Sequence, residues 1–142
     1  MKIKFGLLII ISTLLFSCNS KKTVVSDNDK LEGTWKLNYI SGPRISFEGL
    51  FPEAKPTINF DFKEVRISGK NSCNNYSCKL DTDGNKINFD VPMITTKMFC
   101  PGEGENIYMS TLKKINTYAI SEDGKTLNFM MGDVEMMRFE KL

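Results

Sequence analysis

The sequence predicts a mainly β domain of the α+β class: a curled antiparallel β-meander, partly barrel-like, with one packed α-helix. Apolar residues alternate with polar ones along most of the chain, which is the pattern of half-buried strands. Turn residues separate these runs, so neighbouring strands are expected to pair as local hairpins. One segment in the second half changes to a helical period. We expect the sheet to curl around its apolar face and the helix to pack against it.

The N-terminal segment, residues 1–17, is typical of a bacterial lipoprotein signal peptide. Lysines precede an apolar run that is too short to require a membrane span, and the run ends in Leu15-Phe16-Ser17-Cys18. These four residues resemble a lipobox, in which signal peptidase cuts before the cysteine and the thiol carries diacylglycerol. We therefore expect Cys18 to be the lipidated N-terminus. The alternative is an ordinary secretory signal with a chance cysteine.

Lipid rather than charge is expected to hold the mature chain to a membrane. Of the 19 basic residues, two lysines leave with the signal peptide, so the 17 that remain balance the 17 acidic ones. A neutral chain without a basic block has no electrostatic reason to bind nucleic acid. Two or more acyl chains anchor a protein stably, so a multiply acylated Cys18 suffices. Position 19 is asparagine, whereas an aspartate after the lipidated cysteine resembles an inner-membrane retention signal. We therefore expect the protein in the outer membrane, on either of its faces.

Three segments are therefore expected along the chain. Residues 1–17 are the signal peptide. Residues 18–30 are polar and have no apolar period, so they form a short solvated tether. Residues 31–142 form one folded domain.

Alternation in the first half of the domain predicts a strand followed by a hairpin. Trp35, Leu37 and Tyr39 share one face of the strand, which we expect to be buried. Pairing around Lys63-Glu64 then places Asp61 opposite Arg66 on the outer face of the hairpin, a favourable cross-strand pair. The inner face of this hairpin would carry Ile58, Phe60, Phe62, Val65 and Ile67.

The last hairpin is predicted around Gly132-Asp133, a recognised two-residue loop. Its apolar face would carry Leu127, Phe129, Met131, Val134 and Met136. Two of the four methionines clustered here fall on that face, which favours core packing over a copper site. Residues 83–85 and 123–125 mark further turns. Residues 81–84 resemble the start of a calcium loop but lack its other ligands, so a hairpin turn is favoured.

Residues 103–115 predict the single helix. Acidic residues come first and lysines last, as the helix dipole favours. One stripe of this helix would carry Tyr108, Thr111, Leu112 and Ile115. Residues 42–56 are irregular but contain Phe47, Leu50 and Phe51, which suit either a lid or partner-binding loop or a satellite cluster folded onto the barrel mouth.

The composition argues against an enzyme. The chain has no histidine, which removes Ser-His and Cys-His nucleophile pairs and the usual zinc sites. It also has no nucleophile elbow, phosphate-binding loop or dinucleotide fingerprint. A pair of carboxylates acting in hydrolysis stays open, because any two acids can meet in a fold. We expect no catalytic residues and no cofactor.

Three cysteines remain after lipidation: Cys73, Cys78 and Cys100. A secreted compartment permits disulfides, and an odd number leaves one thiol over. One disulfide with one buried cysteine is favoured, so no metal site is expected, although three thiols can also bind a soft metal. The strand phase places Cys78 on the same face as Tyr76 and Leu80.

Residues 69–78, Gly-Lys-Asn-Ser-Cys-Asn-Asn-Tyr-Ser-Cys, resemble the META/HslJ-like domain family, whose hallmark is a glycine-flanked Cys-Asn-x-Tyr segment after a hairpin. The later Thr-Thr-x-Met-x-Cys, residues 95–100, also fits. So do the opening strand from Leu31, the helix and the closing strand pair. The resemblance covers residues 31–142 and implies that the family motif includes Asn74, Tyr76, Thr95, Thr96 and Met98.

The resemblance also implies a disulfide and a setting. It pairs Cys73 with Cys100 and leaves Cys78 as an extra, reduced thiol, because the family usually has glycine at that position. Family members are associated with the bacterial envelope or with secretion, and some with heat shock, antibiotic tolerance or motility. No catalytic residues are agreed for the family.

We therefore expect a monomeric, non-enzymatic, lipid-anchored envelope protein that serves stress tolerance or binds an envelope protein. The alternative is a lipocalin-like barrel for a small apolar ligand, because Gly33-Thr34-Trp35 also fits the lipocalin Gly-x-Trp pattern. A cavity lined by Phe60, Phe89 and Phe129 would favour the ligand-binding barrel, and a packed core the interaction module. A thiol-redox or soft-metal protein is the third option.

Overall fold

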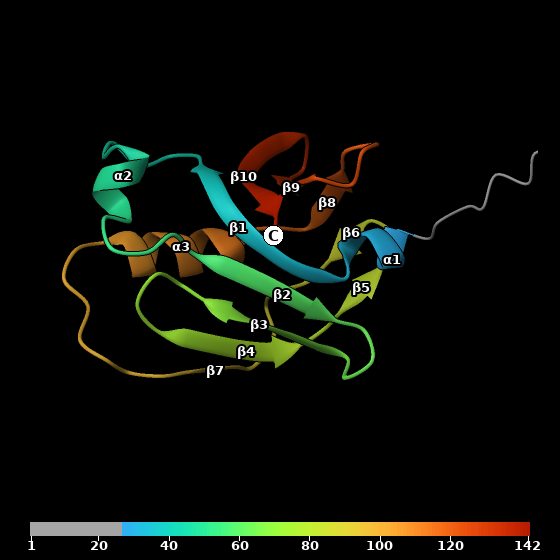
Figure 1. Cartoon of the computed structure of the whole chain (residues 1–142), viewed down its shortest axis with the longest axis horizontal. Coiled ribbons are helices and arrows are strands. Elements are labelled where there is room, and N and C mark those ends of the chain that lie inside the picture. The colour runs from blue at the N-terminus through green and yellow to red at the C-terminus, as the bar shows by residue number, and fades with distance from the viewer. Residues whose placement is uncertain (1–26) are drawn as a thin grey trace, which may run out of the picture.

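One antiparallel sheet of ten strands organises the part of the chain that the computed structural model describes, residues 27–142 (Figure 1). Three helices accompany it. The elements are α1 (Asp27–Leu31), β1 (Gly33–Ile40), α2 (Phe47–Leu50), β2 (Thr57–Asp61), β3 (Arg66–Lys70), β4 (Asn75–Lys79), β5 (Thr82–Asp83), β6 (Lys86–Ile87), β7 (Met93–Thr95), α3 (Gly104–Leu112), β8 (Thr117–Ile120), β9 (Thr126–Met131) and β10 (Val134–Lys141). The predicted signal peptide, Cys18 and most of the tether lie outside the described residues.

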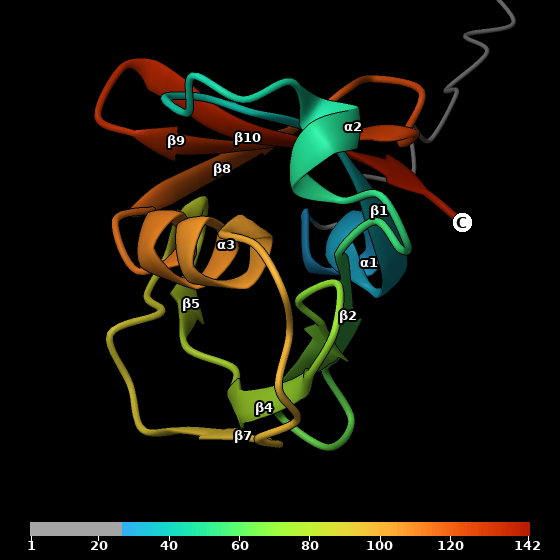
Figure 2. The ribbon, with the colours of Figure 1, turned by 90° about the vertical axis from the view of Figure 1, so that its left-hand side faces the viewer.

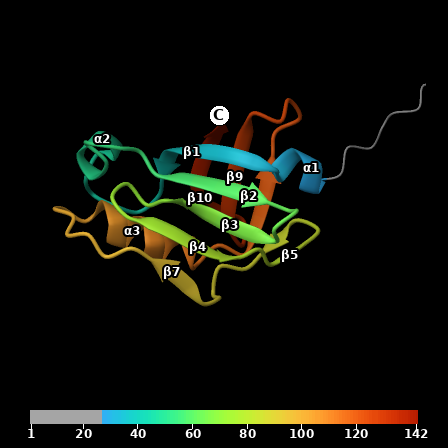
Figure 3. The same cartoon turned by 60° about the horizontal axis from the view of Figure 1, so that its bottom comes forward.

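The sheet consists of two meanders joined by the first and last strands. Its order is β5-β6-β8-β9-β10-β1-β2-β3-β4-β7, and the sheet is not closed. Antiparallel pairing of β1 with β10 runs from Trp35 opposite Lys141 to Ile40 opposite Met137. The sheet curls so that β8, β9 and β10 face β4 and β7, with α3 between them at one end (Figure 2). Figure 3 shows β1–β4 crossing in front of β9 and β10. The predicted mainly β class is confirmed.

The register of the β2–β3 hairpin is confirmed, but its turn is longer than predicted. Asp61 lies opposite Arg66, as expected. The strands end at this pair, so four residues rather than two form the loop. Asp61 accepts a hydrogen bond from the backbone N–H of Glu64, which favours the longer turn. Val65 takes a positive φ of 49° there, and its side chain is exposed instead of facing the core.

Two β-bulges correct the predicted inward faces. In β1 the register shifts between Leu37 and Tyr39, so Tyr39 turns outward and Ile40 becomes buried. In β10 the register shifts between Glu135 and Met137. A bulge inserts one extra residue and reverses the alternation beyond it. Beyond this bulge Met137 and Phe139 are fully buried, and Met136 is partly buried. Met131 and Val134, predicted to face inward, pair next to the hairpin turn and are exposed.

The predicted helical stripe is confirmed, with a shorter helix. Tyr108, Thr111, Leu112 and Ile115 are all buried, but α3 ends at Leu112.

Two short helices were not predicted. α1 begins at Asp27, inside the predicted tether, and Trp35 donates its indole N–H to the Leu31 carbonyl 2.9 Å away. α2 lies in the stretch predicted as irregular, which packs Leu50 and Phe51 onto the core. No helix among residues 27–142 is long and apolar enough to cross a membrane.

Phenylalanine rings fill the space between the two halves of the sheet. Phe60, Phe89 and Phe129, which would line a ligand cavity in the alternative barrel, are fully buried. The ring centroid of Phe129 lies 6.4 Å from that of Phe60 and 5.4 Å from that of Phe89. Phe139 approaches the same ring to 5.1 Å. Rings at these distances are in direct contact, so this part of the core is packed.

Truncation of Phe129 to alanine should destabilise the fold strongly, because the ring is fully buried among three other rings. We expect the free energy of unfolding to fall by about 3–5 kcal/mol. Phe99→Ala is the matched control, because the Phe99 side chain is 93% exposed. It should change the free energy by less than about 0.5 kcal/mol. Urea unfolding followed by the fluorescence of the single tryptophan measures both, and equal losses would contradict the packed core.

Candidate functional site

The residues of the predicted family motif meet at one end of the sheet. Cys73 and Asn74 lie in the loop between β3 and β4, and Thr96, Met98 and Cys100 lie in the segment after β7. This segment, residues 96–103, runs to the start of α3 and is called the connecting segment below. It lies beside α3 and α2 at the left of Figure 1, at the opposite end from α1.

Asn74 holds the connecting segment through its side chain. The carboxamide is buried, and its oxygen accepts the Met98 backbone N–H and the Thr96 hydroxyl, both at 2.8 Å. Its nitrogen donates to the Met98 carbonyl at 3.0 Å. One side chain therefore satisfies both backbone polar groups of Met98, as a neighbouring strand would. The Thr96 hydroxyl also accepts the Asn75 backbone N–H at 3.0 Å, which extends the ladder between β4 and β7.

Asn71 and Glu105 complete this network and were not predicted from the sequence. Fully buried Asn71 donates its side-chain N–H to Glu105 at 2.8 Å and accepts the Asn74 backbone N–H at 2.8 Å. The Asn74 amide also donates to both Glu105 carboxylate oxygens, at 3.2 and 3.1 Å. Glu105 lies in the first turn of α3, where a negative charge is favourable. The Asn-x-x-Asn spacing at 71–74 is the signal that could have indicated the turn.

Tyr76 extends from the motif across β3 into the core. It lies opposite Gly69, and its hydroxyl donates to the Thr57 carbonyl at 3.1 Å and lies 2.7 Å from the Tyr108 hydroxyl. A Cβ at position 69 would overlap the Thr57 carbonyl and lie 2.7 Å from the Tyr76 hydroxyl. The Thr57 backbone and the Tyr76 ring therefore both require a glycine at position 69. Burial raises the pKa of Tyr76 well above its usual value, and nearby Tyr108 raises that pKa further, so the pair stays protonated.

The cysteines adopt the arrangement that the family resemblance implied. Cys73 and Cys100 form a disulfide with their Cα atoms 6.1 Å apart. Cys78 is a free, buried thiol on β4. Burial raises the pKa of this thiol to about 11, so it is protonated and unreactive at neutral pH.

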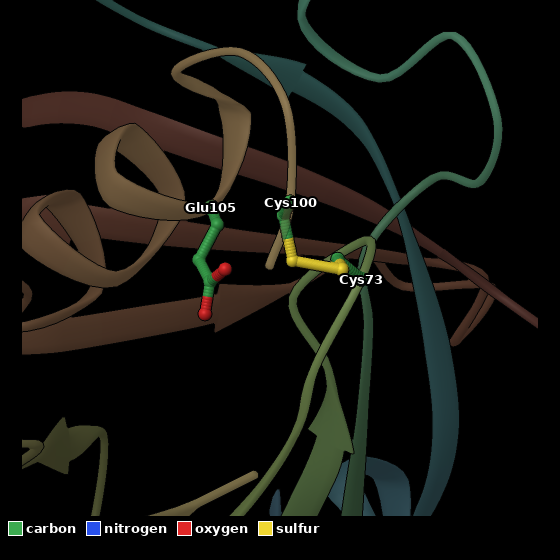
Figure 4. Close-up of side chains that lie close together, drawn as sticks. All are labelled: Cys73, Cys100 and Glu105. Carbon is green, nitrogen blue, oxygen red and sulfur yellow. A yellow bond between two sulfur atoms is a disulfide. The ribbon is translucent and has the colours of Figure 1, made fainter. Parts of the chain in front are cut away.

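A small cavity adjoins the disulfide. It has a volume of about 310 Å³, and its walls include Cys73, Cys100 and Glu105. Lys70 and Glu53 also line it, with opposite charges. Among the described residues, the two sulfurs of this disulfide and one carboxylate oxygen of Glu105 lie within 4.8 Å of one another (Figure 4). Because the disulfide occupies both sulfurs, this oxidised arrangement offers a metal only the carboxylate.

The connecting segment presents large apolar side chains to solvent. Phe99 is 93% exposed and Met98 is 57% exposed. Ile94 on the edge strand β7, just before the segment, is 79% exposed. The Asn74 hydrogen bonds to the Met98 backbone and the disulfide at Cys100 fix the chain on both sides of Phe99. These apolar residues are therefore exposed on an anchored backbone.

Comparisons with known proteins agree with this fold. A family model described as META domain matches residues 29–141. An NMR structure of a protein from Burkholderia xenovorans has 19% identity and a TM-score of 0.62, covering 81% of this chain and 86% of its own. A crystal structure of a DUF4847-family protein from Bacteroides vulgatus has 16% identity and a TM-score of 0.53, covering 78% and 92%. No curated protein matches. These structural likenesses concern the fold alone.

Asn74→Ala should loosen the connecting segment and destabilise the domain. The change leaves the Met98 backbone groups without their partner and removes one of the two amides that donate to Glu105, so we expect a loss of about 3 kcal/mol or more. Hydrogen exchange of the Met98 amide should become faster by a larger factor than exchange in the central strands. Asn75→Ala is the matched control, because that neighbouring side chain is exposed. Unchanged protection of the Met98 amide would show that Asn74 does not hold the segment.

Proposed function

Because the chain belongs to the META domain family, we propose that it is a lipid-anchored protein of the bacterial cell envelope whose META domain binds another envelope protein and catalyses no reaction. The main support for a binding role is that Met98 and Phe99 are exposed on a backbone that a disulfide and Asn74 hold in place. Exposed apolar residues that lie close together mark interaction sites. A rigid loop also loses less conformational entropy on binding than a mobile one.

The packed core supports this proposal over the ligand-binding barrel. A small apolar ligand needs a cavity inside the sheet, and the rings of Phe60, Phe89 and Phe129 occupy that space in mutual contact. The open sheet also differs from the closed barrel of a lipocalin.

The placement of the apolar residues favours a protein partner over the anchoring membrane. The lipid is proposed at Cys18, and the described chain begins at α1, at the opposite end of the long axis from the connecting segment (Figure 1). Nine residues, 18–26, would span about 30 Å at most. An anchor on the α1 side therefore leaves Phe99 at the end of the domain that is farther from the attachment point. Envelope stress tolerance is the proposed setting, in keeping with the associations of the family.

Cys18→Ala should remove the lipid from the protein, because the Cys18 thiol is its proposed attachment point. Cells fed a clickable fatty acid should label the wild-type chain and not the variant. Ser20→Ala serves as the control and should keep the label. Equal labelling of the Cys18→Ala variant and the wild type would contradict the anchor, whatever the outcome for partner binding.

Replacing Met98 and Phe99 with serine should abolish partner binding without affecting the fold, because both side chains are exposed. A photo-reactive residue at exposed position 97 should form one discrete adduct in cells, and the double variant should lose it. Strains relying on the double variant should also lose tolerance to heat or antibiotics.

Met131→Ser with Val134→Ser is the matched control, because these apolar residues are exposed on the β9–β10 hairpin. This control should keep the adduct and the tolerance. Both double variants should unfold within about 1 kcal/mol of wild type. An adduct that survives loss of Met98 and Phe99 would refute the proposed binding site.

A further inference from the structure

The cavity beside the disulfide has metal-ligand atoms on its wall that the proposed binding function does not use. The Sγ atoms of Cys73 and Cys100 and a carboxylate oxygen of Glu105 lie within 4.8 Å of one another (Figure 4). They come from three parts of the chain: the β3–β4 loop, the connecting segment and α3. All three residues line the same cavity of about 310 Å³. Their ligand atoms therefore converge on one point.

We propose that reduction of the Cys73–Cys100 disulfide creates a binding site for one zinc-like divalent cation, held by the two thiolates and the Glu105 carboxylate. A thiol reductant supplies two electrons, which break the sulfur–sulfur bond. Two reductant thiols give up their protons to the cysteines and form their own disulfide. When the cation binds, both cysteine protons pass to solvent and two metal–sulfur bonds form.

The ligand types fit this class of cation. Zinc binds thiolate, imidazole and carboxylate ligands in a tetrahedron, with metal–sulfur bonds near 2.3 Å, which places two sulfurs about 3.8 Å apart. Once the disulfide is broken, both cysteine side chains can rotate about their Cα–Cβ bonds to reach this separation. The third ligand lies beside the pair already. Two thiolates favour zinc and softer ions over magnesium or calcium.

Glu105 is oriented before any cation arrives. Asn71 donates to it at 2.8 Å, and Asn74 donates to both of its oxygens at 3.2 and 3.1 Å. Such partners fix the orientation of a ligand and commonly change metal affinity about 10–100-fold. Oε1 of Glu105 accepts from both amides, whereas Oε2 accepts from Asn74 alone and keeps a lone pair for a cation. The two amides therefore act as the outer shell of the site.

The cavity supplies the fourth coordination position. Three protein ligands leave one corner of a tetrahedron open, and a volume of about 310 Å³ holds a metal-bound water with room for a small ligand. Glu53 on the cavity wall adds negative charge, which opposes the positive charge of Lys70.

The disulfide and the bound cation exclude each other. The oxidised protein has a disulfide and no thiolate ligands, and the reduced protein has a cation in its place. The cation would join the same three parts of the chain that the disulfide and the Asn74 network join now. Cys78 has no role, because it is buried on β4 opposite Ile67 and Met93 and outside the cluster.

Cobalt(II) tests the site, because a cobalt–thiolate bond gives a charge-transfer absorption that a carboxylate or a water does not. The full chain, purified in detergent, is titrated with cobalt(II) before and after reduction, and the metal is then displaced with zinc. The reduced chain should bind one cobalt(II) with thiolate absorption and release two protons. The oxidised chain should show no such absorption. Zinc should raise the melting temperature of the reduced form only.

Variants distinguish cation binding at the proposed site from nonspecific binding by the two reduced thiols alone. Glu105→Gln should weaken cobalt binding at least about tenfold in the reduced chain. Glu103→Gln, which changes an exposed carboxylate two residues earlier, and Cys78→Ser should leave the affinity unchanged. Circular dichroism of the reduced chain shows whether it remains folded.

Three results would overturn the proposal: equal affinity of the Glu105→Gln variant and the wild type, loss of binding in Cys78→Ser, or no thiolate absorption. An unfolded reduced chain that binds through its thiols alone gives the first of these. None of these results bears on the partner site, which involves Met98 and Phe99 in the oxidised protein.

Discussion

The carboxamide of Asn74 is the contact on which this end of the molecule depends. The connecting segment has no regular secondary structure, so its backbone groups need partners from elsewhere. Asn74 supplies both partners for Met98 and also reaches Glu105, which begins α3. Burial makes each of these hydrogen bonds necessary, because an unpaired polar group in that position costs about 1–3 kcal/mol. One side chain thus couples the β3–β4 loop, the connecting segment and the helix.

The disulfide and the Gly69–Tyr76 pair strengthen the same junction in different ways. The disulfide closes the chain between residues 73 and 100, and a loop of this length reduces the entropy of the unfolded state by an amount worth about 3–4 kcal/mol. Tyr76 crosses over Gly69 to contact α3 through Tyr108. The Cys73–Cys100 disulfide, the buried Asn74 amide and the contact between Tyr76 and Tyr108 therefore hold together the β3–β4 loop, the connecting segment and α3. This redundancy explains how the chain keeps Phe99 in solvent at a fixed position.

Much of the fold could be predicted because alternation reports burial directly. The strand faces around Trp35, Phe60 and Tyr76 and the stripe on α3 follow from residue spacing alone. The errors concern Tyr39 and Val65, where a bulge or a longer turn changes the phase, and Met131 and Val134, which lie next to the last hairpin turn. A bulge depends on how two distant strands fit each other, and one strand's sequence does not contain that information.

The candidate site could be predicted only in part. The cysteine pair and Asn74 came from a family motif, whereas Asn71 and Glu105 came from the structure alone. Glu105 is 31 residues from Asn74, and nothing local distinguishes it from the other acids near the start of the helix. Its role follows from folding, which brings the helix N-terminus to the β3–β4 loop.

The pairing of β1 with β10 has a consequence for the order of events during biosynthesis. Trp35 and its partner Lys141 lie at opposite ends of the domain sequence. A ribosome or a secretion channel delivers β1 early, so one edge of β1 stays uncovered until the last residues emerge. Pairings between such distant segments also form slowly. A nascent chain therefore needs protection from premature strand pairing, and truncation by even one C-terminal strand would leave the two meanders unjoined.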